Sequence, residues 1–489
     1  MTAEYKQLPE AAQPGSAPDE GYKRGLGPRQ VQMMAIGGAI GTGLFYGSGT
    51  SISKMGPSLI ASYAVAGVVV FFIMRALGEL LTYRPCSGSF ADYAREFLGP
   101  FAGFVTGWSY WALWITAGMA EISAAGVYVN YWWPSIPVWA TAASVLVILA
   151  LTNLVSVQVF GELEFWFSTI KVVAILALIV IGIGVLTFGF SPIGATASLT
   201  HLWSDGGFAP HGAWSAMVAI QGVIFAYVGI ELVGLTAGET ENPKQTLRKA
   251  INAVPIRIGI FYIGTLTILL SVFSWTQYTP GVSPFVQVFA HVGLPAAAGV
   301  MNFVVLTAAL SSANSGLYST GRMLRGLAVT GGAPKAMRQL STRRVPLPAL
   351  LVSAFVIGIG VVVNVVSPEK AFIYITSVAS CAGIWTWLMI LIAQLRYRSK
   401  VRAGLLPASD FRMPGAPVTN WLAIAILLFV IVLMANDADS RLGLYVWAMW
   451  FAFLGVGYLI SSRKLLIADP DVSREYGSST DDAARRAGR

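Results

Sequence analysis

The sequence predicts an all-α, polytopic membrane protein, and three observations support this fold class. Of the 489 residues, 55% are hydrophobic and 11% are charged, whereas soluble domains carry about 25% charged residues. The mean hydropathy is +0.67. Apolar segments of about 20 residues, the length that crosses a bilayer as a helix, recur along the chain. We expect about twelve transmembrane helices, at residues 31–52, 57–83, 100–131, 138–158, 165–188, 214–238, 255–276, 296–325, 347–366, 370–396, 419–435 and 442–462.

The basic residues follow the membrane topology that these spans imply. With both termini on one side, nearly all of the 32 Lys and Arg fall on that side, and the other side receives only Lys54, Lys370 and Arg441. This asymmetry is the positive-inside rule, so the net charge of +9 requires no nucleic-acid partner. Residues 1–24 are polar and lack the apolar core of a cleavable signal. We expect both termini to be cytoplasmic.

The first span is interrupted by glycine. Five glycines lie between Gln32 and Gly47, and each costs a helix interior about 1 kcal/mol relative to Ala. An unwound segment at membrane depth is tolerated only where protein buries it or where it lines a cavity. Gly41, Thr42 and Gly43 are therefore a candidate ligand site, where a ligand can approach the main chain and meet the positive end of a half-helix. Close packing of two helices is the alternative explanation.

The sixth span carries a second interruption. In the stretch FAYVGIELVG, residues 225–234, Gly229 lies in mid-span beside the acidic Glu231. Broken helices at matching positions of two halves indicate a transporter built from inverted repeats. We expect a disordered cytoplasmic tail, two repeats of five spans, two additional spans and a second cytoplasmic tail, at residues 1–24, 25–195, 196–396, 397–464 and 465–489.

Polar side chains inside the other spans have two possible roles each. Glu121 in the third span is either functional or hydrogen-bonded to a neighbouring helix. Lys171 in the fifth span is either an interfacial anchor or an ammonium group that reaches the broken first span. Ser311, Ser312 and Asn314 in the eighth span either link helices or face a wet cavity. In the second span, Arg75 and Glu79 lie four residues apart, which predicts a structural ion pair.

The residue inventory does not favour an enzyme. Two cysteines, Cys86 and Cys381, make neither a disulfide framework nor a Cys-rich metal site. We find no nucleophile with its base, no ligand set for a metal ion and no nucleotide-binding motif. We therefore expect no catalytic centre, no cofactor and no metal ion.

These motifs carry a family resemblance. Through IGGAIGTGLF (36–45), FGELEFWFSTIKV (160–172), FAYVGIELVG (225–234) and SSANSGLYSTGRM (311–323), the chain resembles the amino acid–polyamine–organocation superfamily, and within it the bacterial amino-acid transporter family. The resemblance covers roughly residues 22–464. It implies a leucine-transporter-like fold, with a five-plus-five inverted repeat, broken helices 1 and 6, and two extra C-terminal helices. HLWSDGG (201–207) and INAVPIRI (251–258) are most similar to the D-serine/D-alanine/glycine:proton symporters of that family.

The resemblance also implies roles for individual residues. The Gly41–Gly43 and Gly229 breaks would form the substrate site, where Thr42 and Gly43 would donate hydrogen bonds to the substrate carboxylate. The carbonyls of Ala39, Phe225 and Val228 would accept from its ammonium group. Lys171 matches a lysine that replaces a sodium ion in relatives and is linked to proton coupling. We place Glu121, Glu231, Ser311, Ser312 and Asn314 beside it as candidate coupling or gating residues.

The implied function is import of D-serine, D-alanine and glycine by proton symport, with alternating access, in the inner membrane of a bacterium. The expected partners are a small amino acid, protons and the lipid bilayer. Two alternatives stay open. The substrate could be another amino acid of the same family, namely asparagine, proline, an aromatic residue or 4-aminobutyrate. The protein could also be a receptor or channel that binds an amino acid without coupled flux.

Overall fold

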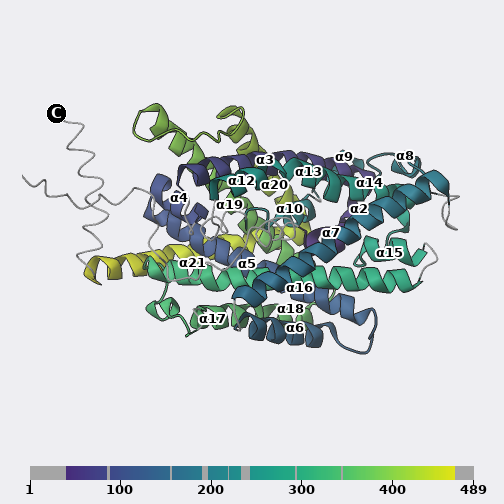
Figure 1. Ribbon diagram of the computed structural model, residues 1–489, viewed down its shortest axis with the longest axis horizontal. Helices are drawn as coiled ribbons and strands as arrows, with labels where there is room; N and C mark the ends of the chain where they lie inside the picture. The colour runs from purple at the N-terminus through teal and green to yellow at the C-terminus, as the bar shows by residue number, and fades with distance from the viewer. Residues whose placement is uncertain are drawn as a thin grey trace, which may run out of the picture.

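We describe the fold from a computed structural model, which covers residues 40–84, 89–154, 157–189, 197–218, 220–232, 243–291, 295–342 and 345–468. Within these ranges every regular element is a helix. Figure 1 shows that the longest helices run along the long axis of the molecule, as expected of a bundle that crosses a bilayer. The described residues therefore agree with the predicted all-α membrane fold.

Nine helical stretches of the described residues are long and apolar enough to cross a membrane. They are Gly43–Tyr83, Pro100–Asn130, Gly161–Phe188, Val254–Val272, Ala296–Val329, Leu347–Val366, Ala371–Arg402, Val418–Asn436 and Ala438–Ile460. The first stretch joins the end of the predicted first span to the second, and Gly56, at φ +58°, turns the chain between them. Glycine tolerates this conformation because it lacks a Cβ.

Two predicted spans fall outside this set, and a third is only partly described. The span at 138–158 is the shorter helix α6 (Val138–Asn153). The first span begins outside the described residues and continues as the π-helix η1 (Gly43–Gly47) and α2 (Ser48–Met55). The sixth span is divided into α9 (Gly212–Val218) and α10 (Gln221–Tyr227), and residues 233–242 lie outside the described ranges. A total of twelve helices stays a prediction.

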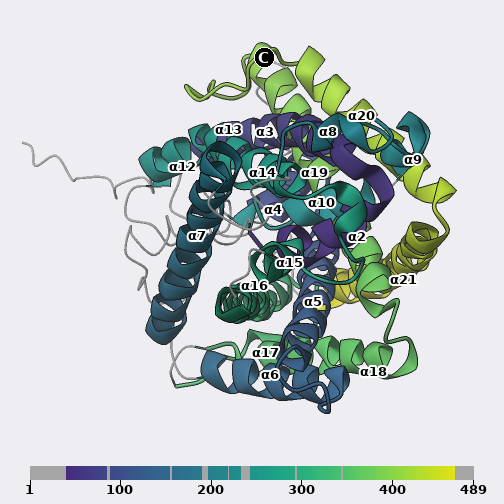
Figure 2. The same ribbon diagram turned by 90° about the vertical axis from the view of Figure 1, so that its right-hand side faces the viewer.

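The interior of the bundle is formed by helices that bury most of their surface. In α5 (Pro100–Asn130) and α19 (Ala371–Arg402), 83% of the most apolar window is buried, against 28% in α7 (Val157–Phe188) and 17% in α21 (Ala438–Ala468). In Figure 2, α7, α6 and α21 surround α5, α10 and α16 (Pro295–Val329). The outer helices expose apolar side chains such as Phe355 and Phe453, which suit contact with lipid.

The remaining helices either form parts of these spans or connect them. They are η2 (Gly56–Ser58), α3 (Leu59–Tyr83), α4 (Ser89–Leu98), α8 (His201–Ser204), α12 (Pro243–Asn252), α13 (Val254–Arg257), η4 (Ile258–Gly264), α14 (Thr265–Val272), η5 (Trp275–Gln277), α15 (Pro284–His291), η6 (Lys335–Arg338), α17 (Leu347–Ile357), α18 (Ile359–Val366) and α20 (Val418–Asn436). Figure 1 places α4 near the end of the molecule where α21 ends, and α8 and α15 at the opposite end.

One predicted ion pair has a different partner. Glu79, buried in α3, accepts hydrogen bonds from Nε and Nη2 of Arg398 in α19, both at 2.8 Å. Arg75 instead donates to Asn252 and to the main-chain carbonyl of Arg412. The predicted pairing within α3 is therefore wrong. The i, i+4 spacing allowed it, but a planar guanidinium on a neighbouring helix offers two parallel hydrogen bonds.

Candidate functional site

The described part of the first span begins at the glycines that predict a break, and the residues before Ile40 lie outside the described ranges. Gly41 is a bend, the amides of Leu44 and Phe45 both donate to the Gly41 carbonyl at 3.3 Å, and η1 follows as a π-helix. Short π-helical segments widen the turn and are frequent at functional sites. The result is a half-helix whose first amides lie inside the protein, with Thr42 and Gly43 buried.

The sixth span breaks at Val228. The helix α10 ends at Tyr227, Val228 has an extended ψ of 134°, and Gly229 adopts φ +102°. The carboxylate of Glu231 accepts the freed Gly229 amide at 3.2 Å and also the Nε1–H of Trp387 at 3.3 Å. Glu231 therefore stabilises the break itself, because an unpaired main-chain group at this depth costs several kcal/mol.

The two breaks touch, and the glycines of the first break have different roles. A Cβ at Gly43 would lie 2.5 Å from Cα of Ala226, so this glycine allows the two broken helices to pack closely. A Cβ at Gly41 would instead lie 2.8 Å from Oε1 of Glu121 and 3.3 Å from Oγ of Ser312. Close packing, the alternative kept open for the glycine run, thus accounts for Gly43, whereas Gly41 faces polar side chains.

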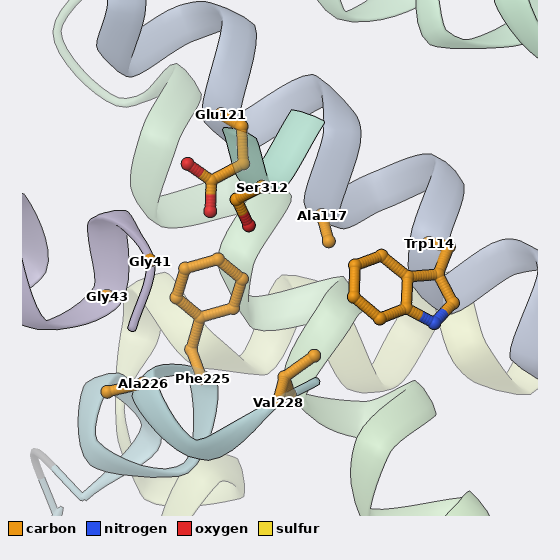
Figure 3. A pocket seen from close by; sticks show the side chains of 9 residues that line it. All are labelled: Gly41, Gly43, Trp114, Ala117, Glu121, Phe225, Ala226, Val228 and Ser312. Carbon is orange, nitrogen blue, oxygen red and sulfur yellow. The ribbon is translucent and has the colours of Figure 1, made fainter. Parts of the chain in front are cut away.

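A small cavity of about 10 Å³, room for about one water molecule, lies between the two breaks, α5 and α16 (Figure 3). Its lining residues are Gly41, Gly43, Trp114, Ala117, Glu121, Phe225, Ala226, Val228 and Ser312. One end is polar, where Figure 3 shows the Glu121 carboxylate and the Ser312 hydroxyl side by side. The other end is apolar and is bounded by the Trp114 ring, Ala117 and Val228. A chamber with one polar and one apolar end suits a small amphipathic ligand.

Glu121 extends from α5 to the first break. Its Oε1 accepts a long hydrogen bond, 3.4 Å, from the main-chain N–H of Thr42. Its Oε2 is buried and has no hydrogen-bond partner among the described residues, and the Thr42 hydroxyl is in the same condition. Buried polar atoms are normally paired, so two unpaired oxygens beside this cavity indicate room for a further polar group.

Lys171 is buried, and its side chain lies in a separate cluster behind the cavity. It is 0% exposed and donates from Nζ to Oγ of Ser311 at 2.9 Å. The Ser311 hydroxyl donates in turn to Oε1 of Glu164 at 2.8 Å. An interfacial anchor would keep its ammonium group in contact with water, which a fully buried Lys171 does not. The next residue of α16, Ser312, lines the cavity.

Three other predicted site residues, Asn314, Gly229 and Glu231, do not line the cavity. Asn314 accepts a hydrogen bond from Nδ2 of Asn153 in α6 at 2.8 Å, which is a link between helices. Gly229 provides the turn of the second break, and Glu231 secures it. Ala39 lies outside the described residues.

Four residues that sequence reasoning did not select belong to this region. Ala226 contacts Gly43, Trp114 and Ala117 form the apolar end, and Glu164 is bonded to Ser311. Three of them had a usable signal. Trp114 and Ala117 lie seven and four positions before Glu121, and this spacing places them on the same face of a helix as Glu121. Glu164, seven positions before Lys171, follows the same rule.

These features define a class of protein, an all-helical membrane protein with an internal binding site between two broken helices. Comparison with known sequences identifies the family. The model of the amino acid permease family matches residues 30–466. The chain is 48% identical over 441 residues to the amino-acid permease AapA of Bacillus subtilis, covering 90% of this chain and 95% of the relative. It is 46% identical to the D-serine/D-alanine/glycine transporter of Escherichia coli K12 (91% and 95%) and to the L-asparagine permease of Salmonella typhimurium (86% and 85%).

The chain therefore belongs to the amino acid permease family. It is an amino-acid transporter and not an enzyme. This confirms the superfamily predicted from the glycine-rich first span and the motifs of spans five, six and eight.

Proposed function

We propose that this permease imports small neutral amino acids, with D-serine, D-alanine and glycine as its leading substrates, by proton symport. The observation that carries the proposal is the cavity between the broken helices, in which main chain at Gly41–Gly43 faces an apolar end formed by Trp114, Ala117 and Val228. The 46% identity to a D-serine/D-alanine/glycine transporter supports the choice of substrates.

The proposed binding mode uses main-chain groups of both breaks. The amides of Thr42 and Gly43 donate to the substrate carboxylate, which lies at the positive end of the half-helix. The carbonyls of Ala39, Phe225 and Val228 accept from the substrate ammonium group. The Phe225 carbonyl already accepts the Val228 amide at 3.1 Å and would use its second lone pair. Such a site recognises any α-amino acid backbone, in either chirality.

Selection among amino acids then depends on the space beyond the α-carbon. The apolar end beyond Phe225 is lined by the Trp114 ring, Ala117 and Val228, and a large substrate side chain would have to displace these groups. A charged substrate side chain there would lack a counter-charge, which is costly in a buried site. We expect glycine, alanine and serine to compete with one another, with the D-enantiomers of the last two accepted, and arginine and glutamate to be excluded.

The proposed transport cycle is alternating access between two repeats, residues 25–195 and 196–396, in the inner membrane of a bacterium. The breaks at Gly41–Gly43 and at Val228 hold matching positions in the two repeats, which supports this division. The cytoplasmic side would be the end with most of the lysines and arginines, where α4 lies. Lys171 would occupy the place that a sodium ion takes in related folds and would couple substrate flux to protons.

A second substrate class is favoured by a specific observation. The L-asparagine permease of Salmonella typhimurium is as similar to this chain, at 46% identity, as the D-serine/D-alanine/glycine transporter. The two proposals differ at the apolar end of the cavity, because an asparagine side chain brings an amide that needs hydrogen-bond partners. Trp114, Ala117 and Val228 supply no side-chain acceptor there, and this supports the smaller substrates.

Counterflow of labelled glycine in proteoliposomes tests the proposal. Vesicles preloaded with unlabelled glycine should take up label, and external D-serine, D-alanine and alanine should compete, whereas asparagine should not. An inward proton gradient should drive accumulation that a protonophore abolishes and sodium does not change. Competition by asparagine but not by glycine would assign the asparagine class. Passive equilibration without counterflow would indicate a channel.

A further inference from the structure

We propose that Glu164 is the proton acceptor of Lys171 and that Ser311 carries the proton between them. This inference rests on the proposed proton coupling and assigns it a second titratable group. The two residues face the same way along α7, seven positions apart, which is close to two helical turns. Ser311 reaches between them from α16.

The three side chains form a continuous chain of donors. Lys171 Nζ donates to Ser311 Oγ at 2.9 Å, and Ser311 Oγ donates to Glu164 Oε1 at 2.8 Å. A hydroxyl that accepts from one group and donates to the next can pass a proton by exchanging its own. The Ser168 hydroxyl also donates to Glu164 Oε1, at 3.3 Å, and fixes the orientation of the carboxylate.

All members of this hydrogen-bonded relay are buried, which restricts the charges that they can carry. Glu164, Ser168, Lys171 and Ser311 are all 0% exposed. Charges in such a site are tolerated only when they are paired, and Lys171 and Glu164 are joined here through one hydroxyl. Oε2 of Glu164 is buried without a hydrogen-bond partner among the described residues. Ser311 delivers its proton to Oε1, and Oε2 remains as a second acceptor on the same carboxyl group.

The proton balance of the step is simple. An N–H bond of the Lys171 ammonium breaks, the Ser311 oxygen takes this proton and releases its own, and an O–H bond forms on Glu164. Lys171 and Glu164 begin as a cation and an anion and end as two neutral groups, so the net charge of the cluster is unchanged. The neutral pair avoids the desolvation cost of two buried ions, and the transferred proton can later leave Glu164 for water.

The proton relay from Lys171 through Ser311 to Glu164 has a direction. Glu164 lies seven residues nearer the start of α7 than Lys171, which is about 10 Å along a helix. With cytoplasmic termini, the fifth span begins on the cytoplasmic side. A proton that passes from Lys171 to Glu164 therefore moves inward, the direction that a symporter importing amino acids requires.

Other titratable groups near the relay come from several elements. Glu121 of α5 acts electrostatically on Lys171 and lies beside the cavity. The helices α6 and α14, which also pack on α7, contain no acidic or basic side chain. The groups on the remaining neighbours are Tyr262 in η4 and, in α16, Tyr318, Arg322 and Arg325.

The relay is linked to the substrate cavity through one helix. Ser311 belongs to the buried chain and the adjacent Ser312 lines the cavity. A rotation or shift of α16 on opening or closing the cavity would move both residues together. Breaking the Ser311 contact would then stop proton transfer in one of the two access states, which is what coupling requires.

Glu164→Gln tests the relay, because it keeps the shape of the side chain and removes its capacity to take the proton. The matched control is Glu162→Gln, the same change two positions earlier at an exposed site on the same helix. Both variants should give glycine counterflow within about twofold of wild type. With a one-unit inward proton gradient, the wild type and Glu162→Gln should accumulate glycine up to about tenfold for one proton per substrate. Glu164→Gln should not accumulate it.

Accumulation by Glu164→Gln equal to wild type would overturn the proposal. If that variant is not recovered folded, Ser311→Ala and Ser311→Thr decide the matter. Ser311→Thr keeps the hydroxyl and should retain gradient-driven accumulation, whereas Ser311→Ala should lose it, and equal accumulation by both would also overturn the relay. A wild type that ignores the proton gradient, or that requires sodium, would instead refute the proposed function.

Discussion

The main-chain N–H of Thr42 donates to Oε1 of Glu121 at 3.4 Å, so a side-chain carboxylate from α5 occupies a donor at the start of the first half-helix. We propose the same donor for the substrate carboxylate. Two carboxylates at one amide repel each other, and the site lies where water screens charge poorly. Substrate binding therefore requires Glu121 to move away or to hold a proton.

Glu121→Gln should strengthen substrate binding under alkaline conditions. The amide keeps an oxygen for the Thr42 N–H but carries no charge to oppose the incoming carboxylate. We expect the Kd for glycine at pH 8 to fall by about tenfold, which corresponds to about 1.4 kcal/mol, and its pH dependence to flatten. Equilibrium binding to the purified protein at pH 6 and pH 8 measures both. Weaker binding in the variant would show that Glu121 contacts the substrate ammonium group instead.

Gly41→Ala and Gly43→Ala should fail in different ways. A methyl group at Gly43 meets the main chain of Ala226 at 2.5 Å, which cannot yield without separating the two broken helices, so the variant should lose both transport and thermal stability. At Gly41 the methyl group meets the end of the Glu121 side chain, which can rotate away. Gly41→Ala should keep a Tm near wild type and lose affinity for glycine by about tenfold. Thermal melting in detergent and binding assays separate the two.

The features that could be predicted from the sequence are those that follow from composition and from the spacing of residues, namely the spans and the positions of the breaks. Apolar length predicted the spans, because a bilayer requires about 20 apolar residues. Glycine in the middle of two spans predicted the breaks, and Gly229 at φ +102° shows the physical need for it. At the first predicted break, Ile40 and Gly41 are non-helical and the helix begins at Thr42, but the residues before Ile40 lie outside the described ranges.

What depends on contacts between distant segments could not be predicted. Arg398 is 319 positions from Glu79, and nothing in either segment indicates that they pair. The apolar end of the cavity was missed because Trp114 and Ala117 are ordinary residues of an apolar span. Glu164 was assigned to a connection between spans because the fifth span was started at 165, whereas α7 begins at Val157 and places this carboxylate inside the helix.

The residue at position 117 should set the largest substrate that the protein accepts. Ala117→Val adds two methyl groups at the apolar end of the cavity, beside the Trp114 ring, while leaving the main-chain groups of both breaks in place. We expect glycine uptake to remain within about threefold of wild type and D-serine uptake to fall by at least about tenfold, since overpacking costs about 1–3 kcal/mol. Competition by the two substrates measures the change. An equal loss for both would place the substrate side chain elsewhere.

The pair formed by Glu79 and Arg398 should be important for stability. Its two side chains are 3% and 17% exposed, and removal of one partner of a buried pair costs about 3–5 kcal/mol. Glu79→Ala should therefore lower the Tm strongly. The control is Asp439→Asn, since Asp439 lies 3.8 Å from Lys54 and 3.1 Å from Lys370 at a more exposed site, where ion pairs contribute about 1 kcal/mol or less. Equal melting temperatures would show that Arg398 finds another partner.

Lys171→Ala should uncouple transport from the proton gradient while leaving the substrate site in place. Lys171 contacts Ser311 and does not line the cavity, so glycine binding should stay within about threefold of wild type. Accumulation driven by a one-unit pH gradient should be lost, because the group that receives the proton is gone. The control is Lys54→Ala, which removes a partly exposed lysine in α2. A Lys171→Ala variant that still concentrates glycine after a pH step would contradict this role.

We also predict the effect of Lys171→Ala on stability. Without the Lys171 ammonium group, the Glu164 carboxylate is left in a fully buried site with hydroxyl partners only, a condition that costs several kcal/mol. Lys171→Ala should therefore melt at a lower temperature than wild type. Adding Glu164→Gln removes the uncompensated charge and should restore most of the lost Tm, although not the coupling. If the double variant is no more stable than Lys171→Ala, the two residues do not share a charge balance, and the relay between them would lose its physical basis.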